Sequence, residues 1–172
     1  NNTVTITSAE TPEAARGKDI AMAHLSEVAF WRTSACHDPN AIIRSIAGSV
    51  ALASHTLLVI ESTANGVGNY FHTEWLRAEA GVSDKTAIFV PWYEYGIYTV
   101  PVDDYETLWN SLDPYERGLW QRGLSLEQIA WYNDKRRENT THRAMHAEYP
   151  STADDAFTAN DRGVFATDGI AR

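Results

Sequence analysis

The chain has 172 residues, of which 44% are hydrophobic and 22% charged, enough for one domain with a hydrophobic core. Its formal net charge of −9 argues against a broad basic face for DNA, because neutralising phosphates requires clustered lysines and arginines. No apolar run approaches the roughly 18 to 20 residues that span a bilayer, and the single cysteine, Cys36, excludes an intrachain disulfide, so we expect a soluble intracellular protein.

The first half of the chain alternates between strand-like and helix-like patterns. Residues 3–7 are rich in β-branched side chains and residues 20–25 form an apolar run, so both are predicted to be β-strands. Asp38-Pro39 is typical of a helix N-cap followed by a first-turn proline, and apolar residues recur at helical spacing as far as Ala53.

The alternation continues as far as residue 90. Residues 56–60 form a continuous apolar run that suits a strand buried on both faces, and residues 86–90 are predicted to be a fourth strand. Between them, residues 69–80 have helical spacing, and Gly81 is placed to end that helix. Strands that alternate with helices of this length predict parallel βαβ units and therefore an α/β fold.

Beyond Trp92 the pattern becomes helical. The second of the three predicted helices begins with Ser125-Leu126-Glu127-Gln128, a capping-box sequence. The predicted helices cover residues 104–122, 125–138 and 140–147. The chain is then expected to divide into an α/β core, a helical subdomain and a short exit segment, at residues 1–100, 101–160 and 161–172.

Polar residues directly follow two of the predicted strands. Glu27 comes after the second strand, and Ser62-Thr63-Ala64-Asn65-Gly66 comes after the third. Because the carboxyl ends of parallel strands share one edge of a sheet, these groups are expected to lie close together. A carboxylate at such an edge can activate water, and hydroxyls can sense the γ-phosphate of a nucleotide. Taken alone, Glu27 could instead be a solvated carboxylate, and Asn65-Gly66 an ordinary tight turn.

Two further blocks complete the pattern. They are Phe89-Val90-Pro91-Trp92 and Glu148-Tyr149-Pro150-Ser151-Thr152-Ala153-Asp154-Asp155-Ala156-Phe157. In this order, and preceded by His24-Leu25-Ser26-Glu27-Val28-Ala29-Phe30-Trp31 and Glu61-Ser62-Thr63-Ala64-Asn65-Gly66, these blocks resemble the large terminase subunit of tailed phages, over nearly the whole chain. The resemblance implies the later part of a DNA-packaging ATPase domain and its helical linker subdomain. The implied fold is an incomplete P-loop NTPase-type, mostly parallel sheet with flanking helices, and a nuclease domain is implied beyond Arg172.

The resemblance also implies a role for each site residue. Glu27 would be the catalytic residue that activates the attacking water. Ser62, Thr63 and Asn65 would sense the γ-phosphate and couple hydrolysis to movement. Ser26 stands near the metal position, where the family usually has aspartate. A serine hydroxyl can contact a metal-bound water but carries no charge, which argues against direct Mg²⁺ ligation, so no metal-ligating residue is assigned.

Gly17-Lys18 does not complete a phosphate-binding loop. Pro12 stands at the position of the first glycine, and Asp19 at the position of the hydroxyl residue. Since that loop provides most of the contacts to a triphosphate, this chain alone is not expected to bind ATP tightly. The resemblance places the loop and an adenine-contacting segment upstream of residue 1, so ATP and Mg²⁺ are cofactors expected of the intact protein.

The partners implied by the resemblance are those of a packaging motor: double-stranded DNA, the portal protein, the small terminase subunit and other copies of the same chain, with no membrane. The implied location is the cytoplasm of the host cell. An arginine that acts across subunits, such as Arg32 or Arg44, is not identified by the sequence.

Other conspicuous residues receive structural interpretations. Asp154-Asp155 follow a Ser151-Thr152 helix cap, where acids are stabilised by the helix dipole. Lys135-Arg136-Arg137 is expected to be a solvated helix end. Cys36-His37 has no second Cys or His at metal-ligand spacing. Four aromatic residues at helical spacing are predicted to be core rather than base-stacking platforms: Trp109, Trp120, Trp131 and Tyr132.

Two other function classes remain open. The chain could belong to a helicase-like or other P-loop ATPase, or it could be a non-catalytic interaction domain derived from such an enzyme. A terminase-type loop upstream and a nuclease-type carboxylate cluster downstream would distinguish the packaging motor from another P-loop ATPase, and a genuine start codon just before Asn1 would support the interaction domain.

Overall fold

The computed structural model describes residues 3–9, 19–34, 38–50, 54–139 and 141–159. It contains a small parallel β-sheet and seven α-helices in these ranges, and the chain divides into two compact units, Asn1–Lys85 and Thr86–Arg172. The mixed α and β character predicted from the sequence is therefore confirmed. The two units are described separately below.

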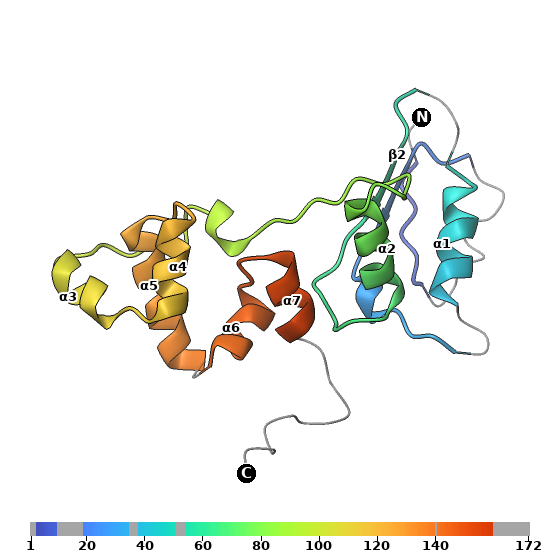
Figure 1. Cartoon of the computed structure of the whole chain (residues 1–172). Coiled ribbons are helices and arrows are strands. Elements are labelled where there is room, and N and C mark those ends of the chain that lie inside the picture. Colours follow the sequence, from blue (N-terminus) through green and yellow to red (C-terminus); the bar gives the residue numbers. More distant parts are fainter. Residues whose placement is uncertain (1–2, 10–18, 35–37, 51–53, 140, 160–172) are drawn as a thin grey trace, which may run out of the picture. The chain divides into compact units, whose positions relative to one another are not determined.

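The first unit is built around two parallel strands, β1 (Met22–Leu25) and β2 (Leu57–Ile60), which pair in register from Met22 opposite Leu57 to Leu25 opposite Ile60. Between them in sequence lies α1 (Pro39–Ala47), and α2 (Tyr70–Glu79) follows β2. Figure 1 shows both helices beside the strands. This β1-α1-β2 arrangement confirms a parallel βαβ unit.

The core of this unit forms where α1 meets the sheet. The buried residues come from β1, from the turn after it and from α1: Ala23, Leu25, Val28, Ile42, Ile43 and Ile46. Tyr70 and Phe71 at the start of α2 pack against this cluster. Burial of these side chains fixes the strand ends, where the candidate site lies, against two helices.

Both predicted helices of this unit form, with Asp38 as the predicted cap of the first and with Asn69, which was not predicted to be a cap, at the start of the second. The Asp38 carboxylate accepts a hydrogen bond from the backbone N–H of Asn40, and the Asn69 side chain accepts one from the N–H of His72. Gly81 has a φ of 68°, the left-handed conformation of a residue that ends a helix. The first helix ends at Ala47 rather than continuing to Ala53, and residues 51–53 lie outside the described part of the chain.

Two predicted strands are wrong. The described residues 3–8 form no strand, and Val4 and Ile6 are 87% and 93% exposed. Residues 86–90 also form no strand, and Ile88 is 75% exposed. Local β propensity was present in both segments, but neither pairs with a strand among the described residues. The prediction that 56–60 is buried on both faces is also wrong, because Leu57 is exposed.

The second unit is helical. Its helices are α3 (Tyr105–Ser111), α4 (Pro114–Gln121), α5 (Leu126–Asn139), α6 (His142–Glu148) and α7 (Ala153–Ala159) (Figure 1). The single helix predicted over 104–122 is wrong, because the chain breaks at Leu112-Asp113. Asp113 precedes a proline, which disfavours helical geometry, and it instead caps α4.

An aromatic cluster forms the centre of this unit. The indole of Trp92 stacks on Trp131 and on Tyr132, with ring centroids 5.1 Å and 5.5 Å apart, and its N–H donates to the Ser151 hydroxyl at 3.0 Å. Tyr98 and Val100 pack against the same core. These contacts group residues 86–100 with the helical unit, whereas the sequence pattern had placed them in the α/β core.

The structural interpretations of the conspicuous residues have mixed outcomes. Trp131 and Tyr132 are buried, as predicted, but Trp120 is half-exposed. Asp155 accepts a hydrogen bond from the Tyr115 hydroxyl at 3.1 Å, and its N–H donates to Thr152, which confirms the helix cap. Arg136 is not a solvated side chain, because its guanidinium donates to the buried carboxylate of Glu116 at 2.8 Å.

His146 on α6 is a largely buried side chain whose charge depends on pH near neutrality. Burial lowers its pKa below 6.5, the proximity of Asp155 opposes this shift, and His142 reinforces it. No described residue hydrogen-bonds its Nε2 atom. The folded state therefore favours the neutral imidazole more strongly than the unfolded state does.

We expect the stability of the chain to fall on acidification below about pH 6.5, because the unfolded chain then binds a proton that folded His146 resists. The loss should be complete once the pH lies below the folded pKa. Urea unfolding of the wild type and of His146→Leu at pH 7.5 and pH 5.5 measures the effect. The variant should lose less stability than the wild type between these pH values, and an equal loss in both would contradict the assignment.

Candidate functional site

The two strands of the sheet end side by side, and their pairing continues past their ends. The N–H of Glu61 donates to the carbonyl of Leu25 at 2.9 Å, and the N–H of Val28 donates to the carbonyl of Glu61 at 3.2 Å. Residues 61–65 are thereby held against residues 26–29. Both polar blocks therefore lie at the carboxyl edge of the parallel sheet, as the sequence predicts.

Glu27 occupies the centre of this edge in an unusual backbone conformation. Its φ and ψ are 55° and 38°, in the left-handed region that non-glycine residues seldom adopt and that costs them about 1 to 2 kcal/mol. The 3₁₀ turn Val28–Phe30 follows at once, and its first two side chains are buried. Because the buried turn fixes the backbone, the Glu27 side chain is held at the edge while it is exposed to solvent.

Two hydroxyls lie beside the Glu27 carboxylate. Ser62 and Thr63 each approach its Oε2 atom at 3.4 Å, with the hydroxyls as donors. These distances exceed the usual 2.5 to 3.0 Å of O–H···O bonds, so the contacts are weak. The carboxylate keeps acceptor capacity, as a group that takes a proton from water must.

The loop at residues 62–65 also forms hydrogen bonds with the backbone next to Glu27. The Ser62 hydroxyl accepts a hydrogen bond from the N–H of Ala29, and the Asn65 amide donates one to the carbonyl of Ala29, both at 3.1 Å. Both polar groups of one buried residue are therefore satisfied by this loop. Ser62 and Asn65 act as a clamp on the turn that carries Glu27, whereas the Thr63 hydroxyl contacts only Glu27 among the described residues.

Asn69 connects this loop to α2. Its side-chain amide donates to the carbonyls of Asn65 and Gly66 at 3.1 Å and 3.3 Å, while its oxygen caps the helix by accepting from His72. Gly66 has a φ of 70°, which allows the tight turn between the loop and the helix. The start of α2 and the loop after β2 are thus joined by side-chain hydrogen bonds as well as by the chain.

Ser26 lies beside Glu27 and is exposed. Its backbone carbonyl accepts a hydrogen bond from the indole N–H of Trp31 at 3.1 Å, which fixes the start of the turn. Sequence reasoning gave no role to a second carboxylate at this edge, Glu61, whose Oε1 lies 3.4 Å from His24 Nε2. Glu61 directly follows the third predicted strand, at residues 56–60. This position at the end of a strand is the signal that could have identified it as a carboxylate of the sheet edge.

Metal and membrane features are few in the described residues. No three His, Cys, Asp or Glu side chains of the described ranges converge on a position that could hold a metal ion. Cys36-His37 and Gly17-Lys18 lie outside those ranges. None of the helices that the structure describes has both the length and the apolar character needed to cross a bilayer.

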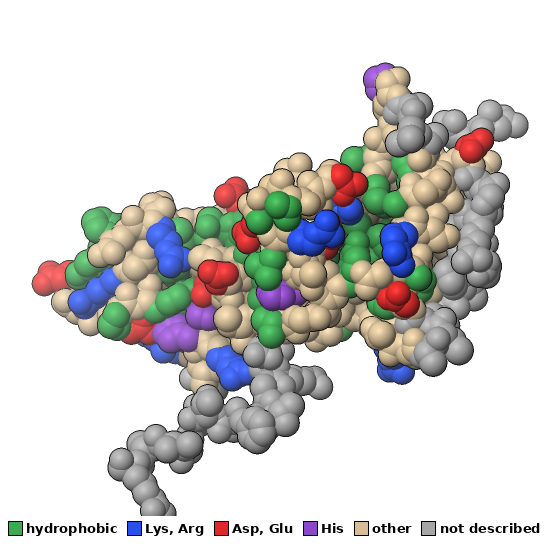
Figure 2. Space-filling model, turned by 45° about the vertical axis from the view of Figure 1, so that its right-hand side comes forward, with side chains coloured by type: hydrophobic (Ala, Val, Ile, Leu, Met, Phe, Trp, Pro, Cys, Tyr) green, Lys and Arg blue, Asp and Glu red, His purple; other side chains and the backbone are tan. Residues whose placement is uncertain are grey.

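Charges on the surface are mixed. On the face shown in Figure 2, the described lysine and arginine side chains are separated by acidic and hydrophobic ones and do not form a continuous strip. This distribution agrees with the net charge of −9 and gives no broad phosphate-binding face there.

The chain matches no protein-family model, no curated protein and no solved structure. A functional assignment consequently depends on the chemistry of the residues at the sheet edge.

Proposed function

We propose that this chain is part of an ATP-hydrolysing motor of the terminase large-subunit type, which packages viral double-stranded DNA into a procapsid. The observation that supports the proposal best is the exposed Glu27 carboxylate at the carboxyl edge of two parallel strands, beside the hydroxyls of Ser62 and Thr63. In nucleotide-hydrolysing α/β sheets, this edge faces the γ-phosphate and the attacking water.

Each residue has a role in the proposed reaction. Glu27 accepts a proton from the attacking water and orients it. Thr63, whose hydroxyl makes one weak contact within the described part of the chain, can turn toward the γ-phosphate. Ser62 and Asn65 keep Glu27 in place through the backbone of Ala29. Their part in coupling is thus positional, and the phosphate-sensing role falls to Thr63.

ATP and Mg²⁺ are proposed as cofactors of the intact protein. When bound, they supply the transferable phosphoryl group and the charge that stabilises it. Glu27, Thr63 and the exposed Ser26 fit the part of such a site that meets water and the γ-phosphate. A phosphate-binding loop and an adenine pocket must come from other parts of the intact protein, because residues 12–19 lack the loop pattern.

The proposed partners are those of a packaging motor in the host cytoplasm: DNA, the portal protein, the small terminase subunit and further copies of the chain. Coupling to DNA movement would pass through α2, since Asn69 ties the helix to the loop that carries Thr63. A shift of Thr63 toward bound phosphate would displace residues 65 and 66 and hence the first turn of α2.

Thr63→Val tests the coupling role. In the intact protein, we expect thermal stability to stay close to wild type, because the hydroxyl makes one long hydrogen bond among the described residues, and we expect ATP still to bind. DNA translocation per ATP hydrolysed should fall several-fold, because a valine cannot bond to the γ-phosphate. The measurements are ATP affinity, ATPase rate, DNA packaging and thermal unfolding on the same preparation.

Two further variants control this experiment. Thr99→Val removes an exposed hydroxyl in the second unit, bonded to the Gly96 carbonyl at 3.3 Å, and should leave translocation unchanged. Asn65→Ala removes the bond to Ala29 and should lower stability by about 1 kcal/mol as well as activity. Packaging by Thr63→Val at wild-type efficiency would contradict the coupling role, and strand separation without packaging would favour a helicase-like ATPase.

A further inference from the structure

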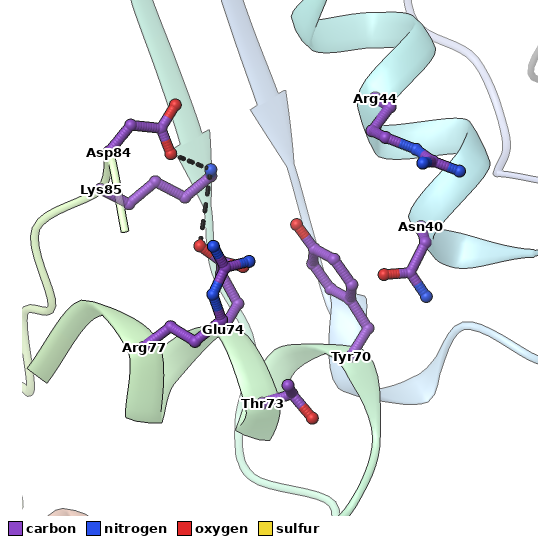
Figure 3. Close-up of a pocket in the computed structure, with 8 residues that line it drawn as sticks. All are labelled: Asn40, Arg44, Tyr70, Thr73, Glu74, Arg77, Asp84 and Lys85. Carbon is purple, nitrogen blue, oxygen red and sulfur yellow. Dashed lines mark hydrogen bonds and ion pairs between the residues drawn. The ribbon is translucent and has the colours of Figure 1, made fainter. Parts of the chain in front are cut away.

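A polar cavity lies between α1 and α2, and none of the residues assigned to the sheet-edge site lines it. Its volume is about 300 Å³. Figure 3 shows side chains entering it from α1, from α2 and from the segment after α2. The lining residues are Asn40, Arg44, Tyr70, Thr73, Glu74, Arg77, Asp84 and Lys85.

The carboxylates of this cavity are already neutralised. The largely buried Glu74 carboxylate forms ion pairs with the Arg77 guanidinium at 3.3 Å and with the Lys85 ammonium at 3.6 Å. It also accepts a hydrogen bond from the Ser83 hydroxyl. Asp84 pairs with the same Lys85 ammonium at 2.6 Å. Three cationic and two acidic side chains line the cavity, so it keeps one positive charge in a chain whose net charge is −9.

The uncompensated charge belongs to Arg44. No hydrogen bond or ion pair from another described residue holds its guanidinium, and the group presents five N–H donors. The Tyr70 hydroxyl also lacks a described partner. Burial and the nearby Glu74 raise the Tyr70 pKa above 10, which keeps the hydroxyl protonated and able to donate. Arg44 is exposed to solvent, so the cavity offers a ligand two donor groups, on facing helices, that no other described residue occupies.

We propose that this cavity binds a phosphate group of a small ligand, held by Arg44 from α1 and by Tyr70 from α2. An arginine fork matches the oxygens of a phosphate, and a hydroxyl donor adds a third direction of approach. The volume is at the lower limit of small-molecule sites, which suits inorganic phosphate or a compact phosphomonoester. The alternative is structural: Arg44 lies in the last turn of α1, where its charge favourably meets the helix dipole.

The proposal is tested by isothermal titration calorimetry, in which the purified chain is titrated with inorganic phosphate at constant ionic strength. We expect saturable binding with one site per chain. Arg44→Gln should weaken it at least tenfold, and Tyr70→Phe several-fold. Arg32→Gln is the matched control, because it removes the same charge from an exposed arginine outside the cavity, and its affinity should stay within twofold of wild type.

Other titrants identify the source of the phosphate. Tighter binding of adenosine monophosphate than of phosphate, with the same loss in Arg44→Gln, would support a nucleotide as ligand, whereas equal affinities would support free phosphate. Acetate binding with the same affinity as phosphate would overturn the proposal. Binding of duplex DNA by a chain that does not bind phosphate would also overturn it. The proposal would also be overturned if Arg44→Gln, with wild-type thermal unfolding, bound phosphate as tightly as the wild type does. A titration with phosphate that does not saturate would overturn it as well.

Discussion

Glu27→Gln in the intact protein should lower the rate of ATP hydrolysis by about 10²- to 10⁴-fold, the usual contribution of a general base. The amide has the shape of the carboxylate, and an amide oxygen at the Oε2 position can still accept the weak hydrogen bonds from Ser62 and Thr63. It cannot take a proton from water. Nucleotide affinity should therefore remain nearly unchanged, and the loss should appear in kcat rather than in KM.

Three variants accompany this measurement. Glu61→Gln removes the other carboxylate of the same edge, which lies beside His24, and should reduce kcat far less. Ser26→Ala should also have a small effect, because its hydroxyl offers only an uncharged contact. Glu79→Gln changes a carboxylate at the end of α2 and controls for net charge. Near-normal turnover of Glu27→Gln would make Glu27 structural, and a large loss in Glu61→Gln would transfer the catalytic role to Glu61.

The largest stability effect is expected at Arg136. Glu116 is fully buried, and its carboxylate is held by the Asn133 amide, by the N–H of Asp113 and by the Arg136 guanidinium. Removing the cation leaves a buried charge without its counter-ion, which typically costs about 3 to 5 kcal/mol. Arg136→Met should therefore lower the free energy of unfolding of the helical unit by about 3 kcal/mol, since the guanidinium is partly exposed.

Arg137→Met is the matched control for this prediction. The neighbouring arginine is 65% exposed and lies 3.6 Å from an exposed Asp134, a type of pair worth about 0 to 1 kcal/mol. Urea unfolding followed by tryptophan fluorescence reports on the core around Trp92 and Trp131. Equal losses in the two variants would show that Glu116 does not depend on its ion pair with Arg136.

The sequence predicted the elements whose signals are local. α1 and α2 were recognisable because their apolar residues recur at helical spacing, because Asp38-Pro39 is typical of a helix start, and because Gly81 is placed to end α2. β1 and β2 were recognisable as apolar runs. Residues 3–7 and 86–90 have the same β-rich composition, yet they form no strand, because a strand requires a neighbour and single-sequence patterns carry no information on pairing.

The candidate site was predictable in its membership but not in its internal contacts. Strand order alone indicates that Glu27 and the 62–65 block share an edge. That Ser62 and Asn65 bind the backbone of Ala29, while Thr63 does not, depends on how the two loops align, which no residue spacing encodes. Arg136 illustrates the same limit, since its partner Glu116 lies on another helix.

The hydrogen bonds of Asn69 connect the two proposed sites of the first unit, the sheet edge at Glu27 and the cavity lined by Arg44. The Asn69 bonds to Asn65 and Gly66 fasten the Glu27 edge to α2, and α2 carries Tyr70, which lines the Arg44 cavity. A ligand that prefers one position of α2 would bias the edge loop by the difference in its affinity for the two positions. Thermodynamic reciprocity then requires that occupancy of the edge alter the affinity of the cavity by the same factor.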